Sequence, residues 1–474
     1  MQYDGLGNPV HLQDPASLGA VNDFVQGFIA CEARAVNVLA VASEGSSLVQ
    51  AYCAALHMFA ESPQGPVNAR PFIEAALRNA PAASPREQLF VAAVAAWVNG
   101  DVPRAIRLHE QLTVEYPRDL ASLKLGQYHL FNQGDAAGLL RLALRALPHA
   151  ADVPYLHGML AFGWEQCHLL EQAEGAARQA ITMCHKEPWA QHALAHVMLT
   201  QGRLVEGQQF MRDSSVTWSG LNSFMATHNW WHLALFALDL GHDDEVLRIY
   251  DEQVWGVVKE YSQDQIGAVS LLARLELAGV DVGDRWQDLG NYLCARVHDH
   301  VLPFLDLQYL YGLARAGRPQ ADVLMRSIEA HCASAVPPSA PGYARPDASQ
   351  AAAVASAQDV WQRVALPASR GLLAHARGDY ARAVDELGAA LPRLMEIGGS
   401  HAQRDLFEQI HLDALMRSGN WSAAQQILQQ KVNTQPQSVR LKLQARSVYT
   451  MLDLDLGVGQ IQPFSFGQLA TASD

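Results

Sequence analysis

A glycine-centred turn recurs along this chain at a fixed spacing, and this periodicity constrains the fold more than any other feature. The interval from Gly100 to Gly134 is doubled between Gly134 and Gly202. His168 stands at the midpoint of that double interval, in the run CHLLEQAEGA, where it replaces the glycine of an otherwise similar turn. Each turn separates two apolar stretches with helical spacing, so the pattern predicts a stack of helix–turn–helix units.

The interval is about 34 residues, which is typical of tetratricopeptide repeats. In such a unit the turn between the two helices favours a left-handed residue, and glycine adopts that conformation without steric cost. The helices also pack closely, which explains the small residue five places after several of the glycines, for example Ala105 and Ala424. From Gly241 to Gly279 and on to Gly317 the spacing is slightly wider, so the helices or loops there are longer.

The expected fold is therefore an all-α solenoid of about eight or nine tetratricopeptide-like helix pairs. A helical cap is expected over residues 1–84, before the first clear repeat, and a non-helical tail over 453–474. The Pro/Ala/Ser-rich stretch 334–358 predicts a flexible insertion, with a long ordered loop as the alternative. Repeats are accordingly expected over 85–333 and 359–452. Runs in which apolar and polar residues alternate, as in a β-strand, are almost absent from the sequence.

The composition excludes several classes of function. The chain has 34 Lys and Arg against 48 Asp and Glu, a formal net charge of −14, so nucleic acid is not an expected partner. No apolar run is long enough to span a membrane and no signal peptide is visible, so no membrane partner is expected either. Six scattered cysteines without a CxxC pair are typical of a reduced, cytoplasmic chain. The oligomeric state stays open.

The repeat register predicts which side chains line the concave face of the solenoid. The first helix of each unit lines that face, and positions spaced by three, four and three residues share one side of it. In the middle of the chain this register groups aromatic residues with histidines, namely Tyr155, Trp189, His192, His196, His228 and Trp231. The expected groove is thus aromatic with histidines at its centre.

Two histidine pairs are the sharpest local feature. His192 and His196 in WAQHALAHVM, and His228 and His232 in HNWWH, are each spaced i, i+4. That spacing brings both imidazoles to one side of a helix, so two adjacent helices could supply three or four nitrogens to a divalent metal. Because the register turns His232 towards a neighbouring helix, a site of His192, His196 and His228 is the version most consistent with the pattern. These histidines could instead bind a polar or anionic ligand, or be core residues satisfied by their neighbours.

A polar run after Gly398 and Gly399 is a second candidate for function. Ser400 is a suitable N-cap, and the free N–H groups at a helix start favour anions. Arg404 could bind a carboxylate there, and the alternative is a buried pair of Arg404 with Asp405 that fixes a corner between repeats. The common phosphate-loop and nucleophile-elbow motifs, GxxxxGK[ST], GxGxxG and GxSxG, are absent.

Several stretches resemble the tetratricopeptide repeat protein 38 family. They include HNWWHLALFALDLGHDDEVLRIYDEQVW, GGSHAQRDLFEQIHLDALMRSGNW, SPREQLFVAAVAAWVNGDVPRAIRLHEQLTVEYPRD and GVDVGDRWQDL, between about Ser84 and Trp421. The resemblance implies an all-helical repeat fold and no particular activity. The matching motif positions are the HNxWH run at His228, Asn229, Trp231 and His232, and the GGSxAQRD run at Gly398, Gly399, Ser400, Ala402, Gln403, Arg404 and Asp405.

The HxxxH of His192 and His196 matches the same family. Met198 and Leu199 stand where the family pattern continues with a further His and Glu, and this departure weakens the metal hypothesis. The general-base glutamate of an HExxH motif is also absent.

The sequence favours a non-enzymatic scaffold that holds a peptide or protein in an aromatic, histidine-containing groove. The expected binding residues are Tyr155, Trp189, His192, His196, His228, Asn229, Trp231, Arg404 and Asp405. The alternative is a small-molecule- or metal-binding enzyme, in which the groove closes into a pocket and His192, His196 and His228 act as metal ligands or as general acid and base. No cofactor is expected of a scaffold, whereas the alternative allows a divalent metal.

Overall fold

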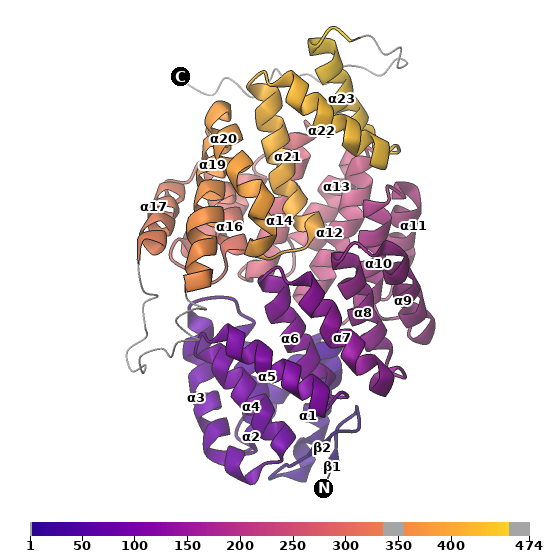
Figure 1. Ribbon diagram of the computed structural model, residues 1–474, viewed down its shortest axis with the longest axis vertical. Helices are drawn as coiled ribbons and strands as arrows, with labels where there is room; N and C mark the ends of the chain where they lie inside the picture. Colours follow the sequence, from indigo (N-terminus) through magenta and orange to yellow (C-terminus); the bar gives the residue numbers. More distant parts are fainter. Residues whose placement is uncertain (1, 335–354, 455–474) are drawn as a thin grey trace.

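The structure is a computed structural model that describes residues 2–334 and 355–454 (Figure 1). Within these residues the chain is helical apart from a short hairpin, in which β1 (Gln2–Tyr3) pairs antiparallel with β2 (Pro9–Val10). None of the described helices is both long and apolar enough to cross a membrane. The N-terminal elements are η1 (Pro15–Ser17), α1 (Leu18–Ile29), η2 (Ala33–Val41), α2 (Ser47–Met58), α3 (Gln64–Asn79) and η3 (Ala80–Ala82).

The remaining helices pack in consecutive pairs, which confirms the all-α solenoid. The first members of the pairs are α4 (Pro85–Val98), α6 (Leu120–Asn132), α8 (Pro154–Gln166), α10 (Pro188–Thr200), α12 (Ser223–Asp239), α14 (Ser262–Leu277), α16 (Pro303–Arg315), α19 (Leu366–Ala376) and α21 (His401–Arg417). The second members are α5 (Val102–Glu115), α7 (Ala136–Ala150), α9 (Leu170–Met183), α11 (Leu204–Ser215), α13 (Asp243–Ile249), α15 (Arg285–Leu293), α17 (Gln320–Ala333), α20 (Tyr380–Ala390) and α22 (Trp421–Thr434), and α23 (Val439–Met451) follows. Short segments adjoin them at η4 (Tyr250–Val254), η5 (Cys294–Arg296), η6 (Trp361–Ala365) and η7 (Leu391–Ile397).

The turns have the left-handed conformation that the period predicts. Gly100, Gly134 and Gly202 have φ angles of 77°, 71° and 69°. His168 has a φ of 58° at the equivalent place, although a residue with a Cβ enters this region only at a steric cost. The repeat therefore keeps its turn geometry even in the unit where the glycine is replaced.

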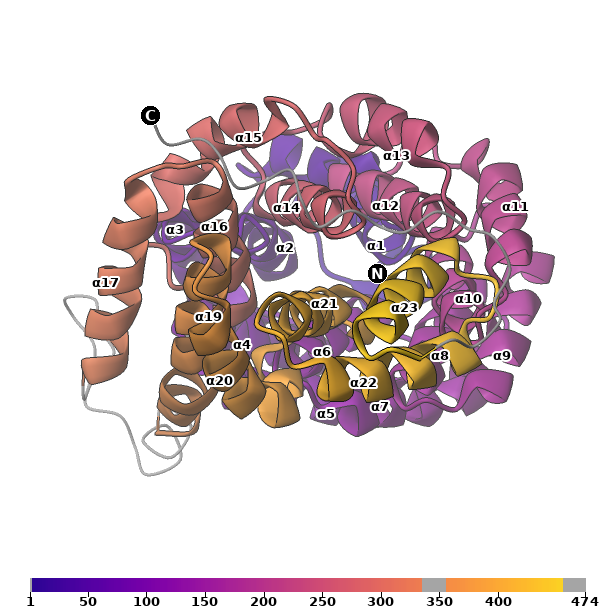
Figure 2. The same ribbon diagram turned by 90° about the horizontal axis from the view of Figure 1, so that it is seen from above.

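The outer helices bury one side only, whereas the inner helices are buried on nearly all sides, as α9 and α10 illustrate. On the outer helix α9 the buried residues are Ala173, Ala177 and Ala180, which form one narrow stripe of small side chains. On the inner helix α10 the run 190–198 is buried without interruption. Figure 2 shows α9, α11 and α13 at the perimeter, with α10, α12 and α14 closer to the centre. Polar side chains on an inner helix are consequently placed inside the protein, where they require partners.

The C-terminal repeats pack against the inner face of the solenoid. In Figure 2, α21 lies beside α14 and α23 lies beside α12, and both pairs of helices are in contact. The guanidinium of Arg274 on α14 donates to the Ala402 carbonyl on α21 at 2.6 Å, and Ser438 before α23 donates to Asp239 on α12 at 2.8 Å. The inner face at the middle repeats is therefore covered by the chain itself, whereas the sequence led us to expect an open groove.

The N-terminal cap also reaches across the interior. The buried Glu61 carboxylate, between α2 and α3, accepts hydrogen bonds from Tyr128 on α6 at 2.9 Å and from Ser262 on α14 at 3.0 Å. The Lys124 ammonium donates to the Ile29 carbonyl at 2.9 Å. These contacts join helices that are far apart along the superhelix and hold it closed.

Two of the expected boundaries can be compared with the structure. The cap over 1–84 is helical but begins with the short hairpin, and the last described helix ends at Met451. Most of the expected insertion 334–358 and of the expected tail 453–474 lies outside the described residues. All six cysteines are described, and each is a free thiol.

Candidate metal centre

The two histidine pairs lie on neighbouring inner helices whose starts are fixed by side-chain caps. Pro188 occupies the first turn of α10, and the Glu187 carboxylate accepts from the Ala190 N–H. The Asn222 side chain accepts from the Met225 N–H at 2.9 Å and begins α12. These caps set the rotation of both helices, so the i, i+4 pairs face each other.

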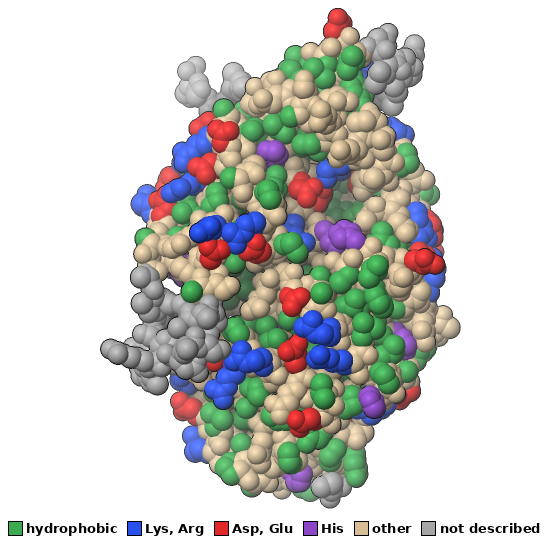
Figure 3. Space-filling view, in the orientation of Figure 1, with side chains coloured by type: hydrophobic (Ala, Val, Ile, Leu, Met, Phe, Trp, Pro, Cys, Tyr) green, Lys and Arg blue, Asp and Glu red, His purple; other side chains and the backbone are tan. Residues whose placement is uncertain are grey.

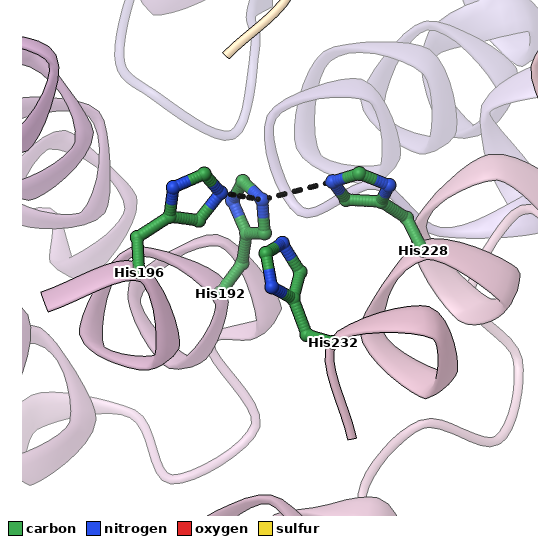
Figure 4. Close-up of side chains that lie close together, drawn as sticks. All are labelled: His192, His196, His228 and His232. Carbon is green, nitrogen blue, oxygen red and sulfur yellow. Dashed lines mark hydrogen bonds between the residues drawn. The ribbon is translucent and has the colours of Figure 1, made fainter. Parts of the chain in front are cut away.

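The four imidazoles converge in the interior (Figure 4). The Nε2 atom of His192 lies 3.0 Å from Nε2 of His196 and 3.1 Å from Nε2 of His228. His232 completes the group, since each of the four residues offers one nitrogen and these nitrogens all lie within 4.8 Å of one another. The sequence placed His232 outside the site, and the structure corrects this: the ring of His232 lies 4.5 Å from that of His196, centroid to centroid.

Burial keeps three of these side chains, His192, His228 and His232, in the neutral form. His192 is 2%, His196 1% and His232 0% exposed, while His228 is the most accessible of the four. Burial, and secondarily the neighbouring His196, lowers the pKa of His228 to about 3. Burial likewise lowers the pKa of His192 and His232 well below the ordinary value. A neutral imidazole has a free lone pair, which is the form that binds a metal.

Several buried nitrogens in the group have no protein partner. They are Nδ1 of His192 and both ring nitrogens of His232. In addition, an imidazole nitrogen has either one hydrogen or one lone pair, yet Nε2 of His192 faces two other nitrogens at hydrogen-bond distance. Buried polar atoms are normally paired, so these orphaned nitrogens indicate that the protein alone does not complete this site.

A carboxylate and a fifth histidine adjoin the group on the side of α8 and α21. Oε1 of Glu165 lies 3.3 Å from Nδ1 of His196 and 2.5 Å from Nε2 of His401. Burial raises the pKa of Glu165, but the interactions with His196 and His401 outweigh it and hold that pKa below its ordinary value. A carboxylate that accepts from one ring nitrogen leaves the other nitrogen free for a metal, which is a common arrangement around metal-bound histidines.

Aromatic rings surround the histidines. The Trp231 ring stacks on His228 with 5.2 Å between centroids and 10° between planes, and Phe162 lies 5.3 Å from His192. The guanidinium of Arg274 lies over Trp231 at 5.5 Å. The aromatic rings of Trp231 and Phe162 lower the local polarity, and electrostatic interactions within the site are stronger as a result.

Of the other residues that the sequence predicted for the groove, some lie next to the histidines and some lie elsewhere in the structure. Trp189 packs on His192, and Asn229 is buried on α12 with both amide atoms unpartnered. Tyr155 lines a separate pocket of about 400 Å³ near Arg118.

Arg404 and Asp405 have structural partners and do not form a pair with each other. Arg404 donates to the carbonyls of Gly398 and Gly399, while Asp405 binds Lys431 at 2.7 Å and lies 3.7 Å from Arg274. The alternative hypothesis, a buried pair of Arg404 with Asp405, is therefore wrong.

Acidification is expected to destabilise the metal-free protein through this site. His228 has a pKa of about 3 when folded against an ordinary value of 6.5, so the unfolded chain binds more protons below that value. Stability is then complete above pH 6.5 and falls as the pH falls towards 3, by up to about 1.4 kcal/mol per pH unit for each such histidine.

Urea unfolding of chelator-treated protein at pH 7 and pH 5 measures this loss. A His192→Gln/His228→Gln variant should lose less stability over the same interval, because it lacks two of the responsible groups. An equal loss in both proteins would show that these histidines do not carry the effect.

Known protein families offer no match to this chain. One solved structure that is similar to it is that of Naa15/Naa10 bound to HypK-THB, at 13% sequence identity and a TM-score of 0.25. The similarity covers 91% of this chain and 66% of the chain in that structure, so this protein spans slightly less than two thirds of its length. A likeness at this level says nothing about function, and we base the interpretation of the site on its own geometry.

Proposed function

We propose that this protein is a metal-binding helical-repeat protein, whose centre takes one divalent transition-metal ion through His192, His196, His228 and His232. The observation that carries the proposal is the convergence of four imidazoles, one nitrogen of each lying within 4.8 Å of the others, together with the two unpartnered ring nitrogens of the buried His232. Imidazole nitrogen suits zinc, copper, nickel and iron, whereas magnesium and calcium require oxygen ligands.

The spacing of the nitrogens supports this assignment. Zinc–nitrogen bonds of about 2.0–2.1 Å in a tetrahedral site separate the ligand nitrogens by roughly 3.3 Å. The two shortest separations here, 3.0 Å and 3.1 Å, are within a few tenths of an ångström of that value. Small rotations of the rings would bring all four nitrogens to an ion, and Glu165 would balance part of its charge from behind His196.

The position of His228 suggests where a small molecule would meet the ion. His228 is the most accessible of the four histidines, and Phe224 stacks on it with 5.4 Å between ring centroids. A ligand entering there would replace His228 or add to it, and a bound divalent ion would then polarise that ligand as a Lewis acid. The accessible position of His228 therefore supports the small-molecule- or metal-binding alternative that the sequence left open.

A peptide scaffold receives less support from the same residues. His192, His196, Asn229 and Trp231 are buried, and α21 covers the inner face on which a peptide would lie. On the face shown in Figure 3, basic and acidic side chains lie side by side. That face therefore has no extended positive or negative electrostatic potential that would attract a charged partner. A protein partner would therefore use the outer helices.

Membership of the tetratricopeptide repeat protein 38 family also remains a proposal. It is supported by the HNxWH run, which supplies His228 and His232, and by the GGSxAQRD run, which leads into α21. Both runs meet at the histidine group, because His401 of the second run reaches Glu165.

Metal content tests the proposed function directly. We expect protein purified without a histidine tag or chelator to contain about one equivalent of a transition metal by elemental analysis. The His192→Ala/His228→Ala variant should contain none. His129→Ala is the matched control, because His129 is also buried, has an unpartnered nitrogen and lies outside the group. Wild-type protein that stays metal-free, even after incubation with excess metal and desalting, would refute the proposal.

A further inference from the structure

A second cluster of polar side chains lies at the junction of η5, α16 and α17. His300, in the loop before α16, contacts Asp306 on α16 through Nδ1 at 2.5 Å and Ser327 on α17 through Nε2 at 2.7 Å. Nδ1 of His298 lies 2.9 Å from the same Ser327 hydroxyl. A serine, a histidine and a carboxylate thus form one continuous chain of hydrogen bonds.

The partners of His300 fix its tautomer. An ionised carboxylate only accepts hydrogen bonds, so Nδ1 of His300 carries the hydrogen that points to Asp306. In the neutral ring Nε2 then has the lone pair, and the Ser327 hydroxyl donates its hydrogen to it. This is the order of donors and acceptors in which a histidine acts as a general base towards a serine.

The carboxylate end of this chain of hydrogen bonds is buried, whereas the serine end is partly exposed to solvent. Asp306 is 1% exposed, and its second oxygen has no partner, so its charge is directed to His300. The neighbouring Asp299 pairs with Arg296 at 3.1 Å instead. Ser327 is partly exposed and His298 is exposed, so a molecule from solvent can reach the hydroxyl oxygen.

The backbone and the neighbouring rings hold His300 in place. His300 has a φ of 45°, a conformation that a non-glycine residue rarely adopts and that the surrounding contacts must maintain. The ring of His331 stacks on it with 4.9 Å between centroids, and Trp361 meets it edge-on at 5.9 Å. The base is therefore positioned by packing as well as by Asp306.

We propose that Ser327, His300 and Asp306 form a nucleophilic site that hydrolyses small carboxylic esters, separate from the metal centre. Ser327 is the nucleophile, His300 the general base and Asp306 the residue that orients His300. Nδ1 of His298 lies 2.9 Å from the Ser327 oxygen, and a small turn of its ring would direct an N–H to the carbonyl oxygen of the ester, on which the oxyanion develops during attack. This role matters because Ser327 lies in the middle of α17, where its own backbone N–H is used within the helix.

The reaction balances without a further reagent. The Ser327 oxygen forms a bond to the ester carbonyl carbon, and its proton passes to Nε2 of His300. The carbon–oxygen bond to the leaving alcohol breaks, and that alcohol takes the proton from His300. Water then attacks the acyl-serine with the same base, which releases the carboxylic acid and restores the serine.

The position of the serine selects the substrate class. Ser327 is partly exposed and lies one helical turn before His331, whose ring packs on Trp361, so an ester with a small acyl group is the substrate that fits this position. An alcohol portion with a flat ring would pack against the imidazole edges of His298 and His331. We therefore choose p-nitrophenyl acetate as the substrate probe and a fluorophosphonate as the covalent probe.

The test is covalent labelling of chelator-treated protein, in which a metal-bound hydroxide cannot contribute. The fluorophosphonate should add once per chain, with a new phosphorus–oxygen bond at Ser327 and loss of fluoride, as mapped by peptide mass spectrometry. Ser327→Ala should abolish the adduct, and His300→Gln should slow labelling and p-nitrophenyl acetate turnover by about 100-fold or more.

Ser334→Ala is the matched control and should label like wild type. Ser334 lies at the end of the same helix, and its hydroxyl donates to the Ala330 carbonyl at 2.9 Å, with no histidine involved. Circular dichroism of each variant shows whether it is folded. Absence of an adduct at Ser327 in the folded wild type, or equal labelling in folded His300→Gln, would overturn the proposal and leave the metal centre unaffected.

Discussion

Removal of the proposed metal ion is expected to destabilise the whole protein. An ion that binds only the folded state stabilises it by about 4 kcal/mol when its free concentration is 1,000 times the dissociation constant. The four proposed ligands come from α10 and α12 alone, but Glu165 on α8 contacts both His196 and His401 on α21. The ion would therefore tie the central repeats to the C-terminal helix that covers them.

Thermal unfolding with and without a strong chelator measures this contribution. The melting temperature of wild-type protein should fall when the chelator removes the metal and rise again when zinc, nickel or copper is added in excess of the chelator. The His192→Gln/His228→Gln variant should melt at one temperature under all of these conditions. If the melting temperature of the wild-type protein changes with neither chelator nor added metal, the ion has no structural role.

The second large effect is expected at Gly134, where a turn glycine also meets the C-terminal repeats. A Cβ added to Gly134 would overlap the backbone carbonyl of Met395, just before α21. The left-handed conformation of Gly134 adds roughly 1–2 kcal/mol of strain for any other residue. Overpacking against a backbone atom adds roughly a further 1–3 kcal/mol, because a carbonyl cannot rotate away as a side chain does.

Gly100→Ala is the control for Gly134→Ala. Gly100 has a similar φ of 77°, but nothing lies within 4 Å of an added Cβ, so only the conformational strain is expected there. Urea unfolding should show a clearly larger loss for Gly134→Ala. Hydrogen exchange should locate the extra opening at α21 and the segment before it. An equal decrease in the free energy of unfolding of the two variants would mean that the C-terminal repeats do not pack against this turn in solution.

The sequence predicted the local structure of the repeats well. The recurring turn was recognised even at His168, because a left-handed residue between two helical stretches leaves a pattern that survives replacement of the glycine. The short hairpin of β1 and β2 was not predicted, since such short strands cannot show an alternating pattern.

The candidate site was predicted in part. His192, His196 and His228 are brought together as expected, because an i, i+4 spacing on adjacent inner helices suffices to place them. His232 was missed because the register of an ideal repeat turns it towards a neighbouring helix, whereas in the structure its ring faces those of His192 and His196. The contact between Glu165 and His401 was not predicted, because His401 stands in the GGSxAQRD run and no sequence pattern links that run to Glu165.

Short-range periodicity in the sequence by itself determined the helices, their turns and the i, i+4 histidine pairs, because these depend on residues within one repeat. The tertiary structure alone decided how far the superhelix curves, since a small rotation at each interface accumulates over the repeats. That curvature brings His401 to Glu165 across 236 residues, places α21 over the inner face and removes the histidines from water. Whether the centre is an open groove or a buried metal site is consequently a property of the closed superhelix, which no single repeat contains.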